Sequence, residues 1–276
     1  MTTTHLLAHM STAEIARIDT SDAVIVQPIG AIEQHGAHLP VMTDALTAER
    51  ISDLAIAGLP EGSNVWQLPT ISYGKSTEHL GRAGTVAMSA ATLTGVCMDL
   101  GRSLAASGFR KLVFVNGHGG QPSLLDVVAR DIRVETGLEV FPMMPGRLGL
   151  PDGVEPVDPD YGIHGGQIET SIVWALAPEL VQMEHAVRDG EVAGSLFAGM
   201  KHLSLEGTVP TAWVTDDLSA SGVLGDPTAA SLELGRRIVD HQVTGLREVL
   251  LEIRGFAFPP VGLDQEARPA ASGALA

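Results

Sequence analysis

The sequence Lys111-Leu-Val-Phe-Val-Asn116-Gly-His118-Gly-Gly120 contains the clearest strand pattern in the chain. Its first half has an apolar centre of strand length, which is typical of a strand buried on both faces of a sheet. A helical pattern precedes it at residues 90–107, and another follows at residues 122–136. Strands that alternate with helices predict parallel pairing, because parallel neighbours need a crossover connection.

The same alternation recurs along the chain. Residues 23–30 and 138–142 are predicted strands, and residues 44–59, 166–177 and 227–254 are predicted helices. Together they predict an α/β fold of three layers, α/β/α, with a mostly parallel central sheet. We expect one domain over residues 1–262 and a flexible C-terminal tail over residues 263–276, which lack an apolar period.

Composition excludes several kinds of partner. The 33 acidic residues against 17 basic ones give a net charge of -16, which repels phosphate backbones and anionic lipids, so neither nucleic acid nor a membrane is expected. The single cysteine, Cys97, lies in a helical pattern and is expected to be a buried thiol. The N-terminal residues lack a cationic start and a long apolar run, which predicts a cytoplasmic protein.

Side chains that bind metals gather after the first predicted strand. Glu33 and His35 are two residues apart, so in extended backbone both point to the same side. Asp44 opens the next predicted helix, close enough in sequence to fold back onto that pair. Such a trio suits zinc, manganese or iron. The alternative is that Asp44 only caps its helix and His35 is a surface loop residue.

A further histidine follows the strand predicted at residues 111–116. Glycines around His118 permit a sharp turn and leave its imidazole at the carboxyl end of the strand, where sites in open α/β sheets collect. A dinucleotide-binding loop is excluded, because a glycine at 117 would require another at position 122, which is Pro122. The non-functional alternative is a tight turn with an incidental histidine.

The third cluster is Gly162-Ile-His164-Gly-Gly-Gln-Ile-Glu169, at the end of a long loop rich in Gly, Pro and Asp. His164 is expected on the loop and Glu169 in the first turn of the next helix. A glutamate there also complements the helix dipole without any metal, whereas His164 has no comparable structural explanation. The sequence contains no H-E-x-x-H, G-x-S-x-G or C-x-x-C motif, which disfavours other hydrolase types.

In these motifs the chain resembles the creatininase (creatinine amidohydrolase) family over about residues 11–255. The shared motifs are Glu33-x-His35-Gly-x-His38-Leu-Pro with Asp44 at the family's E-x-H-x8-D spacing, Asn116-Gly-His118-Gly-Gly, and His164 followed by Glu169-Thr-Ser. Two more matches are Ser76-Thr-Glu78-His79 followed by Gly84-Thr, and Gly222-Val-Leu-Gly-Asp226-Pro-Thr.

The resemblance implies a metal-dependent amidohydrolase that directs a metal-activated water at an amide or lactam C–N bond of a small molecule. It implies two divalent metal ions, with zinc expected first and manganese or iron as alternatives. It also implies a homo-oligomer, usually a hexamer. Carried over by position, Glu33, Asp44 and His118 hold one metal, and His35, Asp44 and Glu169 hold the other.

The resemblance also implies roles around the metals. His164 passes a proton to the departing nitrogen, and Glu169 counts as a catalytic residue as well as a ligand. Four residues are expected to contact the substrate, namely Ser76, Glu78, His79 and Tyr161. A purely structural role for Glu78 and His79 stays open.

The chain departs from creatininase itself at two places. His118-Gly-Gly replaces His-Tyr-Glu, so that the second-metal carboxylate must come from elsewhere, and residues 145–163 lack the tryptophans that close over creatinine. The Gly-Gly version is typical of relatives that cut other bonds. A mycofactocin-type precursor peptide peptidase and a formylamino-pyrimidine deformylase are therefore alternatives, and a metal-braced α/β binding protein is the non-enzyme alternative.

Overall fold

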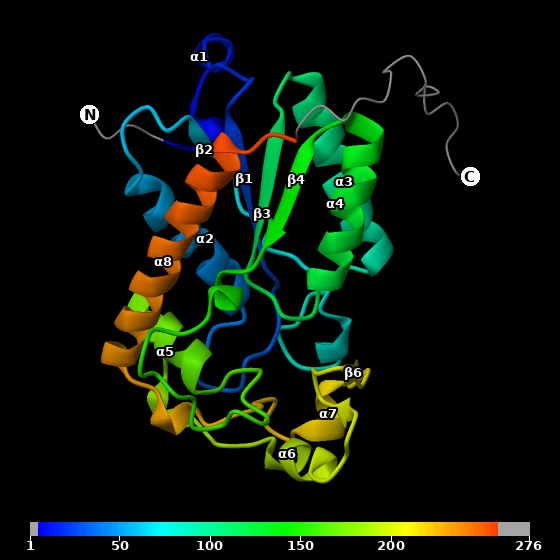
Figure 1. Cartoon of the computed structure of the whole chain (residues 1–276). Helices are drawn as coiled ribbons and strands as arrows, with labels where there is room; N and C mark the ends of the chain where they lie inside the picture. The colour runs from blue at the N-terminus through cyan, green and yellow to red at the C-terminus, as the bar shows by residue number, and fades with distance from the viewer. Residues whose placement is uncertain (1–4, 259–276) are drawn as a thin grey trace.

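A computed structural model describes residues 5–258 and contains a central sheet of four parallel strands in the order β2-β1-β3-β4 (Figure 1). The strands are β1 (Val24–Ile29), β2 (Val65–Gln67), β3 (Lys111–Asn116) and β4 (Glu139–Met143). The central pair, β1 and β3, is aligned from Val24 opposite Lys111 to Ile29 opposite Asn116. The carboxyl ends of these two strands therefore finish side by side.

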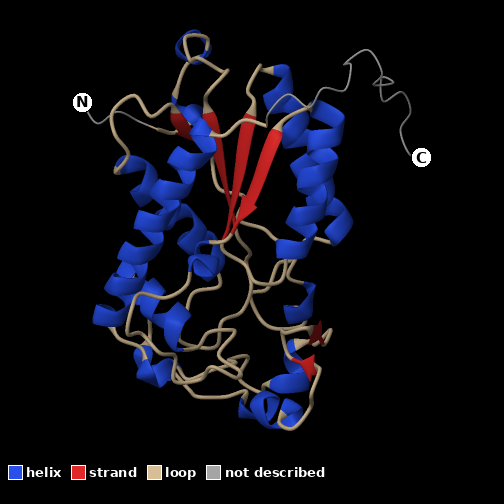
Figure 2. Cartoon of the chain, viewed as in Figure 1, coloured by secondary structure: helices blue, strands red, loops and turns tan. Residues whose placement is uncertain are grey.

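Helices cover both faces of the sheet, because side chains along each strand alternate between two cores (Figure 2). The helices are α2 (Thr43–Ala57), α3 (Ala90–Ala106), α4 (Pro122–Thr136), α5 (Gln167–Leu176) and α8 (Leu232–Gly255). Val24 and Val26 pack with α2, α5 and α8, whereas Ile25 and Phe114 pack with α3 and α4. The predicted three-layer α/β/α fold is confirmed.

Two differences from the predicted elements have local causes. Strand β2 was not predicted, because three residues are too few for a periodic pattern. The last helix begins at Leu232 rather than at residue 227, since Ser231 is extended and its hydroxyl accepts a hydrogen bond from the backbone N–H of Leu234 at 3.1 Å. The predicted tail, residues 263–276, lies outside the described residues.

Short elements complete the described chain. They are α1 (Thr12–Ile15), α6 (Glu191–Phe197), α7 (Thr215–Leu218), the strand pair β5 (Leu203–Ser204) and β6 (Val209–Pro210), and 3-10 turns at Leu7–His9, Thr77–His79, Pro145–Leu148, Pro178–Leu180, Met183–His185 and Pro227–Ala229. Residues 178–218, here named the cap segment, lie beyond the carboxyl end of the sheet (Figure 1). No helix within residues 5–258 is long and apolar enough to cross a membrane.

Candidate metal centre

Five side chains that can bind metals meet beyond the carboxyl ends of β1 and β3. Glu33 and His35 follow β1, Asp44 lies in the first turn of α2, His118 follows β3, and Glu169 lies in the first turn of α5. The first four are buried, and the Glu169 side chain is 32% exposed. The structure thus brings together all five residues that were predicted to hold the metals.

Two glycines let the start of α2 lie against the strand ends. A Cβ on Gly30 would overlap the backbone of Ala45, and a Cβ on Gly117 would overlap the carbonyl oxygen of Asp44. Only glycine permits this approach, so the ends of β1 and β3 fix the position of Asp44. Asp44 is not the helix cap, because the N-cap position of α2 is Met42.

Three histidines each direct one ring nitrogen at a backbone carbonyl. A carbonyl oxygen only accepts hydrogen bonds, so that nitrogen donates, and in the neutral ring the other nitrogen keeps its lone pair. The distances are 3.1 Å from His35 Nδ1 to the Glu33 oxygen, 3.0 Å from His118 Nε2 to the Lys75 oxygen, and 2.6 Å from His164 Nε2 to the Gln34 oxygen. Each remaining nitrogen faces a carboxylate.

The separations between these nitrogens and the carboxylates match those of ligands that share a cation. His118 Nδ1 lies 3.2 Å from Glu33 Oε1 and 3.0 Å from Asp44 Oδ2. His35 Nε2 lies 3.2 Å from Asp44 Oδ1 and 3.9 Å from Glu169 Oε2. Two ligands of a tetrahedral zinc ion are separated by roughly 3.4 Å, given zinc-ligand bonds of about 2.1 Å.

Several of these atoms also lack any other partner. Both carboxylate oxygens of Glu33, Nε2 of His35 and Oδ2 of Asp44 are buried without a hydrogen bond. Unsatisfied buried polar atoms are costly, and a divalent cation would satisfy all of them at once. The residues present therefore fit a metal centre, and the described chain brings Glu33, His35 and Asp44 within reach of one ion.

The close carboxylates and histidines shift the pKa of each other. Burial, and then the charge of Asp44, raises the pKa of Glu33 to about 7. Burial lowers the pKa of His35, but the charges of Asp44, Glu169 and Glu33 outweigh it and raise the pKa to about 10. For Asp44, burial is outweighed by His35 and His118, which hold its pKa below the usual range. Metal binding must therefore displace the protons of His35 and Glu33.

His164 lies between two other imidazoles. Its ring centroid is 4.2 Å from that of His35 and 4.2 Å from that of His79, and its Nδ1 lies 3.8 Å from Glu33 Oε1. Burial, and then the charges of His35 and His79, lowers the pKa of His164 well below its ordinary value. Its backbone is held by Leu224, with which it exchanges hydrogen bonds of 3.1 and 2.7 Å. A neutral imidazole is thus fixed beside the metal ligands.

The predicted substrate contacts divide into two groups. Glu78 and His79 line a cavity of about 260 Å³ that opens on the metal-ligand cluster. Ser76 is fully buried and does not line this cavity. Tyr161 packs in an apolar cluster with Leu224, and its hydroxyl accepts a hydrogen bond from Arg188 at 3.0 Å. Neither Ser76 nor Tyr161 lines this cavity, and a substrate contact by either residue stays a prediction.

Three residues at the site were not found from the sequence. The side-chain amide nitrogen of Gln34 donates to the carbonyl oxygen of Gly222 at 3.0 Å and lies 3.2 Å from His79 Nδ1, so the Gln34 side chain is held beside both His79 and His164. Trp213 and Glu206 of the cap segment line the same cavity as Glu78. Gln34 lies inside the first motif and could have been noticed there, whereas the cap segment shows no pattern that links it to the site.

A parallel α/β/α sandwich with buried histidines and carboxylates at the strand ends has the ligand chemistry of a metal-dependent hydrolase. The chain belongs to the creatininase family, because the family model for creatinine amidohydrolase matches residues 8–250. This places it among the metal-dependent amidohydrolases.

The similar proteins are named for more than one activity. The chain is 34% identical to the mycofactocin precursor peptide peptidase of Mycobacterium tuberculosis (strain ATCC 25618 / H37Rv), over 84% of this chain and 86% of the relative. It is 29% identical to the creatinine amidohydrolase of Pseudomonas putida, over 89% and 94%. A solved structure of creatininase with manganese superposes with a TM-score of 0.71 at 25% identity, covering 90% of this chain and 98% of that chain.

Proposed function

We propose that this protein hydrolyses an amide or lactam C–N bond of a small molecule at two divalent cations, with zinc as the resident metal. The observation that carries the proposal is the set of buried, unpartnered ligand atoms of Glu33, His35 and Asp44. Mixed histidine and carboxylate ligands without cysteine are typical of catalytic zinc sites, whereas structural zinc sites are rich in cysteine.

The chain's own side chains would divide the work. Glu33, Asp44 and His118 would hold one cation, and His35, Asp44 and Glu169 the other. When bound, such cations lower the pKa of water from about 15.7 to about 7, so that hydroxide is available at neutral pH. Asp44 would belong to both ligand sets, because its two carboxylate oxygens lie 3.2 Å from His35 Nε2 and 3.0 Å from His118 Nδ1.

His164 is proposed to move the proton. Its Nε2 donates to the carbonyl of Gln34, so its Nδ1 is free to accept a proton from the attacking water. The same Nδ1 then donates that proton to the departing nitrogen as the C–N bond breaks. The lowered pKa of His164 supports this role, because the ring must be neutral before the reaction begins.

The first cavity limits the substrate and is here named the acidic cavity. Glu33, Glu78 and Glu206 line it together with Trp213, and Lys75 is paired with Glu78 at 2.5 Å. No lysine or arginine of the described chain lines it. An uncharged or cationic group fits these walls, and the phosphate of a formylamino-pyrimidine nucleotide does not.

Metal analysis tests the proposal directly. We expect about two divalent ions per chain in the purified protein and hydrolysis of small amides or lactams that depends on them. Asp44→Ala should lose both ions, whereas Asp131→Ala, at an exposed position on α4, should retain them. Protein without stoichiometric metal, or metal retained by Asp44→Ala, would overturn the proposal. Metal retention without turnover of any amide would favour the metal-braced binding protein.

A peptidase of the mycofactocin-maturing kind is the second candidate, because several relatives with that name are 30–34% identical to this chain, among them one at 34% over 84% of this chain. Incubation with the precursor peptide and with small lactams, followed by mass spectrometry, separates the two. Cleavage of the peptide alone would favour the peptidase, and opening of a lactam alone would favour the small-molecule hydrolase.

A homo-oligomer, with a hexamer as the expected form, is part of the proposal. It is supported by exposed apolar side chains on the loops that follow β1 and β2, namely Val41, Met42, Leu80 and Val86. Light scattering on the purified protein measures the mass, and a monomer would contradict this part.

A further inference from the structure

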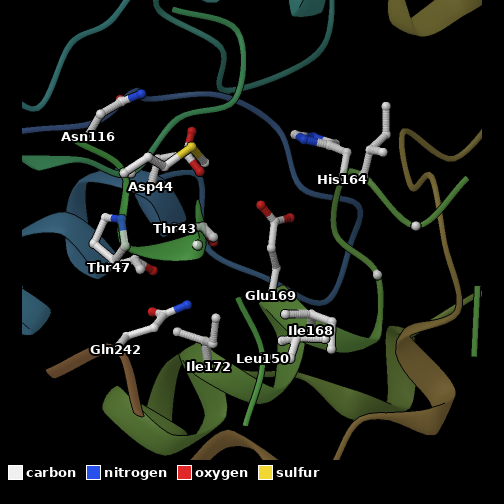
Figure 3. Close-up of a pocket in the computed structure, with 17 residues that line it drawn as sticks. Thr43, Asp44, Thr47, Asn116, Leu150, His164, Ile168, Glu169, Ile172 and Gln242 are labelled. Carbon is white, nitrogen blue, oxygen red and sulfur yellow. The ribbon is translucent and has the colours of Figure 1, made fainter. Parts of the chain in front are cut away.

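A second cavity, here named the apolar cavity, extends from the metal-ligand cluster on another side (Figure 3). Its volume is about 290 Å³, and it shares Asp44, His164 and Glu169 with the acidic cavity. Figure 3 shows the Glu169 carboxylate pointing into the space between Asp44 and His164. A C–N bond held at the cluster would therefore have a cavity on each side of it.

The walls of the apolar cavity away from the cluster carry no charge among the described residues. Leu150, Ile168 and Ile172 form much of them, and the hydroxyl of Thr47 is a neutral polar group at the side of α2. The two cavities thus differ in chemistry, since the acidic cavity has Glu78 and Glu206. Water gains little at apolar walls, whereas an aliphatic or aromatic group is stabilised in proportion to the apolar surface that it buries.

One buried amide stands out on these walls. Gln242 of α8 is 3% exposed, and its Oε1 has no hydrogen-bond partner. Figure 3 places it beside Ile172 and Thr47, on the opposite side of the cavity from His164. Neither the sheet nor the proposed reaction uses this side chain. A buried acceptor without a donor is costly, so an O–H or N–H group of a ligand is its natural partner.

We infer that the apolar cavity is a specificity subsite that binds an uncharged, mainly apolar arm of the substrate, which ends in an O–H or N–H donor for Gln242. The inference rests on the proposed hydrolase function and narrows its substrate class. An engineered cavity of about 150 Å³ holds benzene, so this subsite takes an arm of roughly six to ten heavy atoms. The polar part of the same substrate lies in the acidic cavity.

Straight-chain hydroxamates of two to seven carbons test the subsite, because their head group chelates metals while the chain probes the cavity. Titration calorimetry on the metal-loaded protein should show Kd falling about threefold to fourfold per methylene. A chain ending in a hydroxyl should bind at least as tightly as an alkyl chain of equal length. In Gln242→Leu, the ratio of the Kd of the hydroxyl-ended chain to that of the alkyl chain should rise by about tenfold.

Matched variants of α2 separate filling of the cavity from general damage. Thr47→Phe should flatten the dependence on chain length, whereas Leu54→Phe, on the same helix at a position 44% exposed, should keep it. Affinity that does not depend on chain length in the unaltered protein would overturn the subsite and leave the hydrolase standing. If no hydroxamate of any length bound, the metal centre and the proposed function would fail instead.

Discussion

Gly120 touches two side chains of the proposed site and leaves no room for a side chain of its own. A Cβ there would overlap Glu78 Oε1 and lie 2.5 Å from His118 Nε2, whereas a Cβ on the neighbouring Gly119 would meet no atom within 4 Å. Both glycines belong to the motif that follows β3, and neither has a positive φ. The pair therefore offers a comparison in which the chemical change is identical and only the surroundings differ.

We expect Gly120→Ala to weaken zinc binding by about 10- to 100-fold. The added methyl group would displace Glu78 and His118, and loss of the contacts that orient a ligand histidine lowers metal affinity by about that factor. Competition with a chromophoric chelator measures the affinity. Gly119→Ala should bind zinc as the unaltered protein does. Equal affinities for the two variants would show that Gly120 does not hold His118 in place.

At the scale of elements, a side chain of β3 closes the carboxyl end of α8. Lys111 Nζ donates hydrogen bonds to the carbonyl oxygens of Ile253 at 2.8 Å, Arg254 at 2.6 Å and Phe256 at 2.7 Å. These carbonyls lie at the helix end, where intrahelical donors run out and the dipole favours a cation. Lys111 is only 6% exposed, and its three protons all have acceptors, which makes its burial tolerable.

Lys111→Met should lower the free energy of unfolding by about 2–4 kcal/mol, because three carbonyl oxygens at the helix end would lose their charged donor. Urea denaturation followed by circular dichroism measures this change. Arg110→Met, at the exposed neighbouring position, should change it by less than about 0.5 kcal/mol. Metal content should be unaffected by either substitution, since Lys111 lies at the amino end of β3 and the metal centre at its carboxyl end. Equal urea midpoints for both variants would contradict the capping role.

The elements that could be predicted are those whose pattern is local. Strand β3 and helix α4 have the predicted bounds, because an apolar run and an amphipathic period can be recognised from adjacent residues. The convergence of Glu33 with His118 could also be expected, since neighbouring parallel strands end together. Trp213 could not be assigned to the site, because only the three-dimensional path of the cap segment brings it there. The packing of Tyr161 against Ala193 and Leu205 of the same segment could not be predicted either.

At the scale of the whole molecule, metal binding and folding are linked. A ligand that binds only the folded chain stabilises it by about 2.7 kcal/mol at 100 times its Kd, which corresponds to roughly 5–10 °C in Tm for a chain of this size. Removal of metal with EDTA should therefore lower Tm by that amount, measured by scanning calorimetry. Asp44→Ala should show no response to EDTA.

The same stabilisation should diminish as the pH falls from 8 to 5. The cation held by His35 must displace the proton of this residue, whose pKa is about 10, at a cost in affinity of about tenfold per pH unit. Below about pH 7 the proton on Glu33 adds to this, so the loss becomes steeper. A Tm difference between metal-loaded and EDTA-treated protein that stayed constant over this range would contradict the proposed ligands.

The cap segment supplies Trp213 and Glu206 to the acidic cavity but none of the five proposed ligands, which belong to the strand ends and to α2 and α5. The metal-ligand cluster and this wall of the acidic cavity thus come from separate segments of the chain. Sequence changes in the cap segment can alter the acidic cavity and leave the metal ligands in place, so one fold can acquire new substrates by local change. Relatives named for a peptide and for creatinine are what such divergence would produce.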